Sequence, residues 1–413
     1  MLRSFRSAGS ALLQVLFLML LSACAFAPIG TRTELPAKAL SGLKTANIPI
    51  DAVGAIAIRL SDGAVLLSHR PDASMQPAST LKTVTSIVGL ERLGPTYRGR
   101  SELRSKGEVV DGVLKGDLTL RGLGDPDLDW EALQRMLQTL RHKGVTQIDG
   151  NLILDRQWFQ PPRPDLGAPP FDETPEFRYN VIPDALTLNM NLLQLDMESG
   201  EKIAGVRVNM MPKLDRVTVI SNLTLIDRAC ADWEDGWKIP TVTRGRDGEI
   251  RVELHGEFPK KCATSTSVNV LDRVDFADRL FRTLWRNLGG TFGGQTRDAS
   301  VADSSKGESR LLAQHQSRTL AEVTRDINKR SDNTITRMLY LSMGALAKTD
   351  SEGPTAARAE RQVRAWFKAG YVRDMQNQLC VVVVMINHPL AKDGAARPVL
   401  DAVIDWVARS GKE

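Results

Sequence analysis

The alternation of apolar and polar residues predicts a hairpin followed by a helix near the start of the chain. Residues 54–72 contain two apolar runs around Ser61-Asp62-Gly63, a pattern typical of two antiparallel strands joined by a turn. From Leu81 to Leu93 the apolar residues recur at helical spacing, and Gly94-Pro95 ends the pattern. This region therefore has the mixed character of an α/β fold.

Beyond Pro95 the pattern changes to short strands separated by turn residues, as far as about Cys262. One amphipathic helix interrupts them, with apolar residues on a single face at Leu133, Met136, Leu137 and Leu140. Residues 160–175 are rich in proline and are expected to form a loop. We interpret residues 96–262 as a β-rich inserted region.

Helical patterns return after Cys262, near residues 271–290, from about Thr319, after Arg330 and up to Ala369. Residues 370–387 are interpreted as two strands around a short turn, and residues 396–410 as a closing helix. The predicted architecture is an α/β domain formed by residues 35–95 plus 263–413, split by the insertion at 96–262.

The first 27 residues are interpreted as a secretory signal segment and are excluded from the fold prediction. Arg3 and Arg6 precede an apolar run that is too short to cross a bilayer comfortably. The segment allows two endings: a cleavage site at Ala25 to Ala27, or lipidation of Cys24, whose surroundings resemble a bacterial lipobox. Either ending predicts export to the periplasm, with or without a lipid anchor.

Charge and cysteine content narrow the functional classes. The net charge of +5 is small for 413 residues and there is no dense basic block, so nucleic-acid binding is not expected. Cys230 and Cys262 lie in one polar region and are expected to form a disulfide after export, the alternative being two free thiols. Cys380 lies in an apolar run and is interpreted as a buried thiol. No spacing of cysteines and histidines predicts a metal site.

The stretch PASTLKTVTS (77–86) places Ser79 and Lys82 three residues apart at the predicted start of a helix, where both side chains share a face. A serine needs a neighbouring base to become a nucleophile, and a lysine with a lowered pKa can be that base. Taken alone, this pattern is weak. Ser41 and Lys44 repeat it, and a serine at a helix start is most often a cap.

A second motif, Ser331-Asp332-Asn333, lies in a predicted loop between two helices. Taken alone, this triplet is best explained as a capping turn. Following S-x-x-K, however, S-D-N completes the paired signature of penicillin-recognising serine enzymes, in which a hydroxyl relays the proton and an amide contacts the lysine and the substrate. The two motifs together favour catalysis.

The chain resembles the D-alanyl-D-alanine carboxypeptidase/endopeptidases related to penicillin-binding protein 4. The resemblance extends over most of the chain and includes PASTLKTVTS, GDLTLRGLGDPDL, DGNLILD, PDALTLNMN and KRSDNTITRML. It implies a penicillin-binding-protein/β-lactamase-like fold, with an antiparallel sheet, helices and a large insertion. It implies Ser79 as nucleophile, Lys82 as base, Ser331 as proton relay and Asn333 as a contact to the lysine and the substrate. The substrates would be peptidoglycan stem peptides, with β-lactams as inhibitors and without a cofactor.

The sequence departs from this family at the third motif, because it contains no Lys-Thr-Gly triplet. Lys348-Thr349 is followed by Asp350 and is not expected to serve as a substitute. We predict an internal deletion near 369–370, which would remove the strand bordering Ser79. The alternatives are therefore an active enzyme, an impaired homologue that binds cell-wall peptide or partners, and an unrelated envelope lipoprotein with chance motifs.

Overall fold

The computed structural model describes residues 31–60, 62–169, 174–200, 204–300, 303, 309–347, 352–369, 380–386, 388–394 and 396–408. The chain divides into two compact units, Met1–Ala78 with Tyr371–Glu413, and Ser79–Gly370. The predicted boundaries after residues 95 and 262 both lie inside the second unit. The mixed α/β class predicted from the sequence is confirmed.

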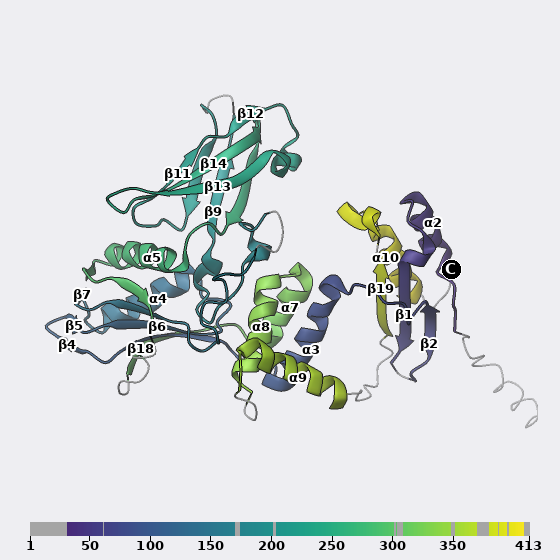
Figure 1. The fold of residues 1–413 in the computed structure, drawn as a ribbon, viewed down its shortest axis with the longest axis horizontal. Helices are drawn as coiled ribbons and strands as arrows, with labels where there is room; N and C mark the ends of the chain where they lie inside the picture. The colour runs from purple at the N-terminus through teal and green to yellow at the C-terminus, as the bar shows by residue number, and fades with distance from the viewer. Residues whose placement is uncertain are drawn as a thin grey trace, which may run out of the picture. The chain divides into compact units, whose positions relative to one another are not determined.

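The smaller unit contains a three-stranded antiparallel sheet in the order β19-β1-β2 (Figure 1). β1 (Val53–Arg59) and β2 (Val65–His69) form the predicted hairpin, and β19 (Cys380–Ile386) pairs along the whole of β1. Helices α2 (Ala37–Thr45) and α10 (Arg397–Ala408) contact each other, and their apolar side chains share one core with the sheet. Two short 3-10 helices complete it, Ile50–Ala52 and Pro389–Gly394.

Four helices of the larger unit pack together and carry both predicted motifs. They are α3 (Leu81–Leu93), α7 (Leu320–Arg330), α8 (Asn333–Ala345) and α9 (Thr355–Ala369). Apolar side chains of α3, α7 and α8 form a shared cluster that includes Leu90, Ile327 and Leu339. The α3 and α8 helices approach closely at Gly89, where an added Cβ would lie only 2.9 Å from the Leu339 side chain. This close packing positions α3 relative to α8.

The remaining strands of the larger unit form what we call the β-rich region, residues 100–316. A five-stranded sheet has the order β17-β8-β6-β3-β18, and three smaller sheets accompany it. Its strands, in chain order, are β3 (Arg100–Ser105), β4 (Glu108–Val110), β5 (Val113–Lys115), β6 (Leu118–Leu123), β7 (Gln147–Ile148), β8 (Leu152–Asp155), β9 (Leu193–Glu198), β10 (Arg207–Met211), β11 (Val217–Ser221), β12 (Thr224–Ile226), β13 (Trp237–Arg244), β14 (Ile250–Pro259), β15 (Ala263–Val268), β16 (Thr291–Phe292), β17 (Thr296–Asp298) and β18 (Arg310–Gln316).

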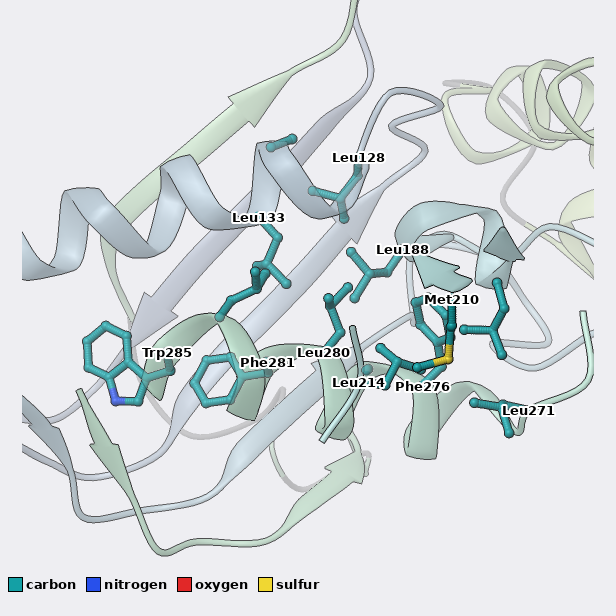
Figure 2. Packing of buried hydrophobic residues seen from close by; sticks show 14 of the residues in the cluster. Leu128, Leu133, Leu188, Met210, Leu214, Leu271, Phe276, Leu280, Phe281 and Trp285 are labelled. Carbon is teal, nitrogen blue, oxygen red and sulfur yellow. The ribbon is translucent and has the colours of Figure 1, made fainter. Parts of the chain in front are cut away.

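Two amphipathic helices supply much of the core of the β-rich region. The α4 helix (Trp130–His142) begins at Asp129, whose carboxylate caps it, and buries the four apolar residues predicted from the sequence. The α5 helix (Arg273–Asn287) contributes Phe276, Leu280, Phe281 and Trp285 to the same cluster, as Figure 2 shows. Short 3-10 helices also occur in this region, at Arg178–Asn180, Leu188–Asn191 and Cys230–Gly236.

The β-rich region extends beyond the boundary predicted near residue 262. β15 pairs with β9, β17 with β8, and β18 with β3, so segments on either side of Cys262 belong to the same sheets. The helical pattern of α5 suggested a return to the first domain. Its apolar face instead completes the core formed with α4, which explains why the predicted boundary does not separate two packing units.

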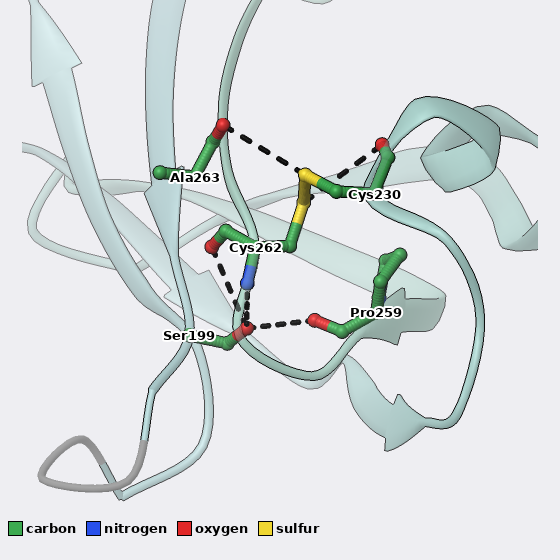
Figure 3. The surroundings of a disulfide bond; sticks show 5 residues. All are labelled: Ser199, Cys230, Pro259, Cys262 and Ala263. Carbon is green, nitrogen blue, oxygen red and sulfur yellow. Dashed lines mark hydrogen bonds between the residues drawn. A yellow bond between two sulfur atoms is a disulfide. The ribbon is translucent and has the colours of Figure 1, made fainter.

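A disulfide joins Cys230 to Cys262 in the β-rich region, with 5.2 Å between their Cα atoms (Figure 3). Next to it, Ser199 Oγ donates to the Pro259 carbonyl at 2.7 Å and accepts from the Cys262 N–H at 3.1 Å. These contacts hold the end of β9 beside the start of β15, and the cross-link adds to the stability of this part of the fold.

Several predictions concern residues outside those described: the signal segment with Cys24, the Lys348-Thr349 pair, the deletion near 369–370, the first of the two strands predicted at 370–387 and the Cys380 side chain. Within the parts of the chain that the structure covers, no helix has the length and apolar character needed to cross a membrane. The same parts contain no cluster of three His, Cys, Asp or Glu side chains suited to a metal ion.

Candidate active site

Ser79 lies at the N-terminal start of α3, where a 3-10 turn (Ala78–Thr80) leads directly into the helix. Ala78 has a φ of 43°, a left-handed conformation that redirects the chain just before the serine. The Ser79 side chain is exposed, and Lys82 is half-buried one turn further along. Lys82 Nζ lies 2.8 Å from Ser79 Oγ, so the helical spacing brings the amine within hydrogen-bond distance of the hydroxyl.

Ser331 approaches the same hydroxyl from the junction between α7 and α8. It ends α7 with a φ of 55° and a ψ of 38°, a left-handed conformation that costs a serine about 1 kcal/mol or more. Its Oγ donates to Ser79 Oγ at 2.9 Å, although 252 residues separate the two serines. The two motifs are therefore brought together at one atom, with the strained junction directing the second serine.

The residues after Ser331 anchor the start of α8. Asp332 caps the helix by accepting from the Ile335 N–H at 2.9 Å, and it forms an ion pair with Arg178 at 3.1 Å. Asn333 Nδ2 donates to the Tyr179 carbonyl at 3.1 Å. The predicted contact of this amide with Lys82 is not among the hydrogen bonds of the described residues, so Asn333 is held by the β-rich region instead.

The electrostatic surroundings favour the neutral form of Lys82. Partial burial lowers the pKa of Lys82 from its usual value, and the Arg337 cation on α8 lowers it further. The Asp332 carboxylate acts in the opposite direction. Because the net shift of the pKa is downward, a larger share of the amine is uncharged at a given pH. An uncharged amine can accept the proton of Ser79.

Contacts further along α3 keep this arrangement in register. Ser86 Oγ lies 3.4 Å from Asn328 Oδ1 on α7, and Trp366 Nε1 on α9 donates to Glu91 at 2.7 Å. Together with the Gly89 packing, these contacts tie α3 to three other helices. A serine, an amine and a second hydroxyl in hydrogen-bond contact can support attack on a carbonyl carbon followed by proton transfer.

Comparison with known proteins identifies the family of the chain. The sequence matches the D-Ala-D-Ala carboxypeptidase 3 (S13) family over residues 39–366, which is most of the chain. The chain belongs to this family. It is 24% identical over 289 residues to the D-alanyl-D-alanine carboxypeptidase DacB of Haemophilus influenzae, a match covering 70% of this chain and 58% of that relative. The chain thus spans little more than half the length of this S13 family relative.

Two solved structures share the fold. The crystal structure of penicillin binding protein 4 (dacB) from Haemophilus influenzae superimposes with a TM-score of 0.61 and 20% identity, covering 87% of this chain and 75% of that one. A second structure of that protein, complexed with a novel β-lactam, gives a TM-score of 0.56 at the same identity, covering 87% of this chain and 74% of that one. These matches confirm the resemblance inferred from the motifs.

Sequence reasoning missed three residues that surround this candidate site. Arg337 is one helical turn beyond Asn333, so the helical pattern of α8 could have indicated its proximity. Arg178 and Tyr179 contact residues 154 positions away, and no local sequence pattern indicates that pairing. Their contribution comes from the packing of the β-rich region against α8.

Proposed function

We propose that the protein is a serine-type D-alanyl-D-alanine carboxypeptidase/endopeptidase that acts on peptidoglycan stem peptides through an acyl-enzyme on Ser79. The observation that carries this proposal is the double hydrogen bond at Ser79 Oγ, from Lys82 Nζ at 2.8 Å and Ser331 Oγ at 2.9 Å. Membership of the S13 family supports the substrate class.

In the proposed acylation, neutral Lys82 accepts the hydroxyl proton of Ser79 while Oγ bonds to the carbonyl carbon of the penultimate D-alanine. The carbon–nitrogen bond to the leaving residue then breaks. Ser331, in contact with Ser79 Oγ, relays the proton to the leaving amine, which departs as D-alanine or as the amine of a cross-linked peptide. The result is an ester on Ser79.

Hydrolysis of that ester completes the cycle. A water molecule gives its proton to Lys82 and bonds to the acyl carbon, and the ester bond breaks. Ser79 regains a proton, and the shortened peptide leaves as a carboxylate. The chemistry uses only water as co-reactant, so the proposal includes no cofactor. β-Lactams are proposed inhibitors because they would form an ester at the same oxygen.

We also propose that the protein works in the periplasm, where peptidoglycan is accessible. The basic and apolar residues before Cys24 support export, and Cys24 is the proposed attachment point of a lipid anchor. Cleavage after Ala27 would instead give a product without that anchor. Metabolic labelling with a fatty acid, compared with Cys24→Ala, distinguishes the two forms: incorporation lost in the variant supports the anchor, and no incorporation refutes it.

A second candidate is a catalytically impaired homologue that binds cell-wall peptide or partners without turnover. The missing Lys-Thr-Gly motif favours this candidate. Losing a single oxyanion donor costs about 10²–10³-fold in rate. Loss of the strand that carries it would therefore leave little activity.

Labelling with fluorescent penicillin separates the two candidates. We expect the purified protein and a Thr83→Ala control, altered at an exposed position of α3, to be labelled, and Ser79→Ala to remain unlabelled. Labelling of Ser79→Ala would refute the nucleophile assignment. If none of the folded proteins is labelled, the impaired homologue becomes the better description.

A further inference from the structure

A cavity of about 320 Å³ in the larger unit has Asp332, the neighbour of Ser331, in its wall. The other walls come from the loop before α4, the turn at Asn189 and the last turns of α7. Ser79, Lys82 and Ser331, which form the hydrogen bonds at Ser79 Oγ, do not line this cavity. The cavity therefore adjoins the candidate active site through Asp332 and its ion-pair partner Arg178, which both line it.

One wall of the cavity has an unusual backbone. Asn189, Met190 and Asn191 are consecutive residues with φ values of 49°, 52° and 54°. Left-handed conformations cost about 1 kcal/mol or more for each such residue, and they concentrate at ligand clamps and active sites. The turn is firmly held, because Asn189 Nδ2 donates to the Leu192 carbonyl at 2.8 Å and Met190 packs on the apolar cluster of α7 and α8.

The acidic side chains around the cavity are already engaged. Asp127 accepts from Arg318 at 2.9 Å, and Asp326 accepts from the same guanidinium at 2.6 Å. Asp129 caps α4, and Asp332 caps α8 and pairs with Arg178. These carboxylates therefore contribute no open cation site, although they make the cavity unfavourable for a ligand carrying several negative charges.

Arg330, in the last turn of α7, differs from those groups. It lines the cavity and is exposed, and among the residues that the structure describes it has no ion-pair or hydrogen-bond partner. Ser267 in the same wall likewise has no side-chain hydrogen bond to any described residue. A guanidinium without an ion pair and a hydroxyl without a side-chain hydrogen bond, both in the lining of one cavity, suit one carboxylate. Trp130, Met190 and Ile335 add apolar surface next to them.

We propose that this cavity binds a carboxylate-bearing segment of the stem peptide, upstream of the D-alanyl-D-alanine end that reacts at Ser79. Arg330 pairs with the carboxylate, and the apolar wall contacts the neighbouring aliphatic part of the peptide. This inference rests on the proposed function, because it assigns a second contact to the same substrate. A single carboxylate fits better than a phosphate because of the four aspartates around the cavity.

The test uses two pentapeptides that end in D-alanyl-D-alanine and differ at one position. One has a second residue D-glutamate with a free α-carboxylate, and the other has the corresponding carboxamide. Binding is measured by calorimetry on Ser79→Ala, which prevents turnover. We expect the carboxylate peptide to bind about fivefold more tightly, the upper range for an exposed ion pair. Adding Arg330→Gln should abolish the difference.

Lys329→Gln is the matched control, since Lys329 is also exposed on the last turn of α7 but does not line the cavity. It should keep the preference for the carboxylate peptide. Equal binding of the two peptides, no binding of either, or a preference that survives Arg330→Gln would overturn the inference. Penicillin labelling of Ser79 in the Arg330→Gln protein is measured as a separate readout. A failed binding test with intact labelling therefore refutes the cavity assignment and leaves the proposed function standing.

Discussion

Two clusters in the larger unit place cationic side chains beside oxygen atoms. One cluster is buried and fully paired, and the other is exposed. In the β-rich region, Asp184 is completely buried between Arg156 and Arg273, with Arg156 Nη1 2.7 Å from its carboxylate and the Leu186 N–H donating to it at 2.7 Å. At the candidate active site, Ser79 is exposed and is contacted by Lys82 and Ser331. In the first cluster the buried carboxylate is fully paired within the protein. In the second cluster the serine hydroxyl is exposed and accessible to a substrate.

The pKa shifts express the same contrast. Burial by itself raises the pKa of Asp184, but Arg156 and Arg273 outweigh it and the net shift is downward, which stabilises the charged form. Partial burial and Arg337 lower the pKa of Lys82, which stabilises its neutral form. The buried cluster therefore fixes charges in place, whereas the exposed cluster prepares a proton acceptor.

The largest expected effect is on catalysis. Lys82→Ala removes the proposed base, so we expect the rate of Ser79 labelling by fluorescent penicillin to fall about 10³-fold. The free energy of unfolding should change little, because Lys82 is only half-buried. Lys329→Ala, at an exposed lysine of α7, should label at the normal rate. An unchanged rate in Lys82→Ala would show that another group accepts the proton.

The next effect is on stability. Asp184→Ala leaves Arg156 and Arg273 buried without their carboxylate, so we expect a loss of about 3–5 kcal/mol in urea unfolding. Asp196→Ala on β9, an exposed position, should cost less than about 1 kcal/mol. A similar small loss in both variants would contradict the idea that the buried cluster holds the fold.

The stabilisation by the Asp184 carboxylate should depend on pH. The lowered pKa of Asp184 means that its contribution is complete above the unfolded value, near 3.8, and is lost as the pH falls through the lower folded value. Acidification through that range should therefore reduce the difference in unfolding free energy between the unmodified protein and Asp184→Ala. A difference that stays constant would argue against a charged Asp184 in the folded state.

The sequence was sufficient where local pattern determines structure. The predicted hairpin of β1 and β2 and the predicted helix α3 are confirmed, because strand alternation, helical spacing and Gly94 are all local signals. The extent of the β-rich region was not predictable in this way. The helical pattern of α5 does not reveal that Phe276 and Phe281 pack in the same core as α4.

At the candidate site, too, local sequence patterns identify some residues but not the tertiary contacts between them. Ser79, Lys82 and Ser331 could be named from two motifs, since a known family resemblance links them. The pairing of Arg178 with Asp332 and of Tyr179 with Asn333 depends on how the β-rich region packs against α8, and this is tertiary information. The left-handed turn at Asn189–Asn191 contains no glycine, and its two asparagines, which tolerate this conformation, do not by themselves predict three consecutive left-handed residues.

The smallest expected effect tests whether the charges of Arg337 and Asp332 set the pKa of Lys82 at the candidate active site. Arg337→Gln removes a cation that lowers the pKa of Lys82, so the pKa should rise and the pH at which Ser79 labelling becomes fast should move upward. Asp332→Asn should move it downward, because the carboxylate raises the pKa and asparagine still caps α8. Arg325→Gln, at an exposed position of α7, should leave it in place. Shifts of opposite sign in the first two variants would establish that Lys82 responds to both neighbours, and shifts of the same sign would mean that changes in packing, rather than charge, govern the site.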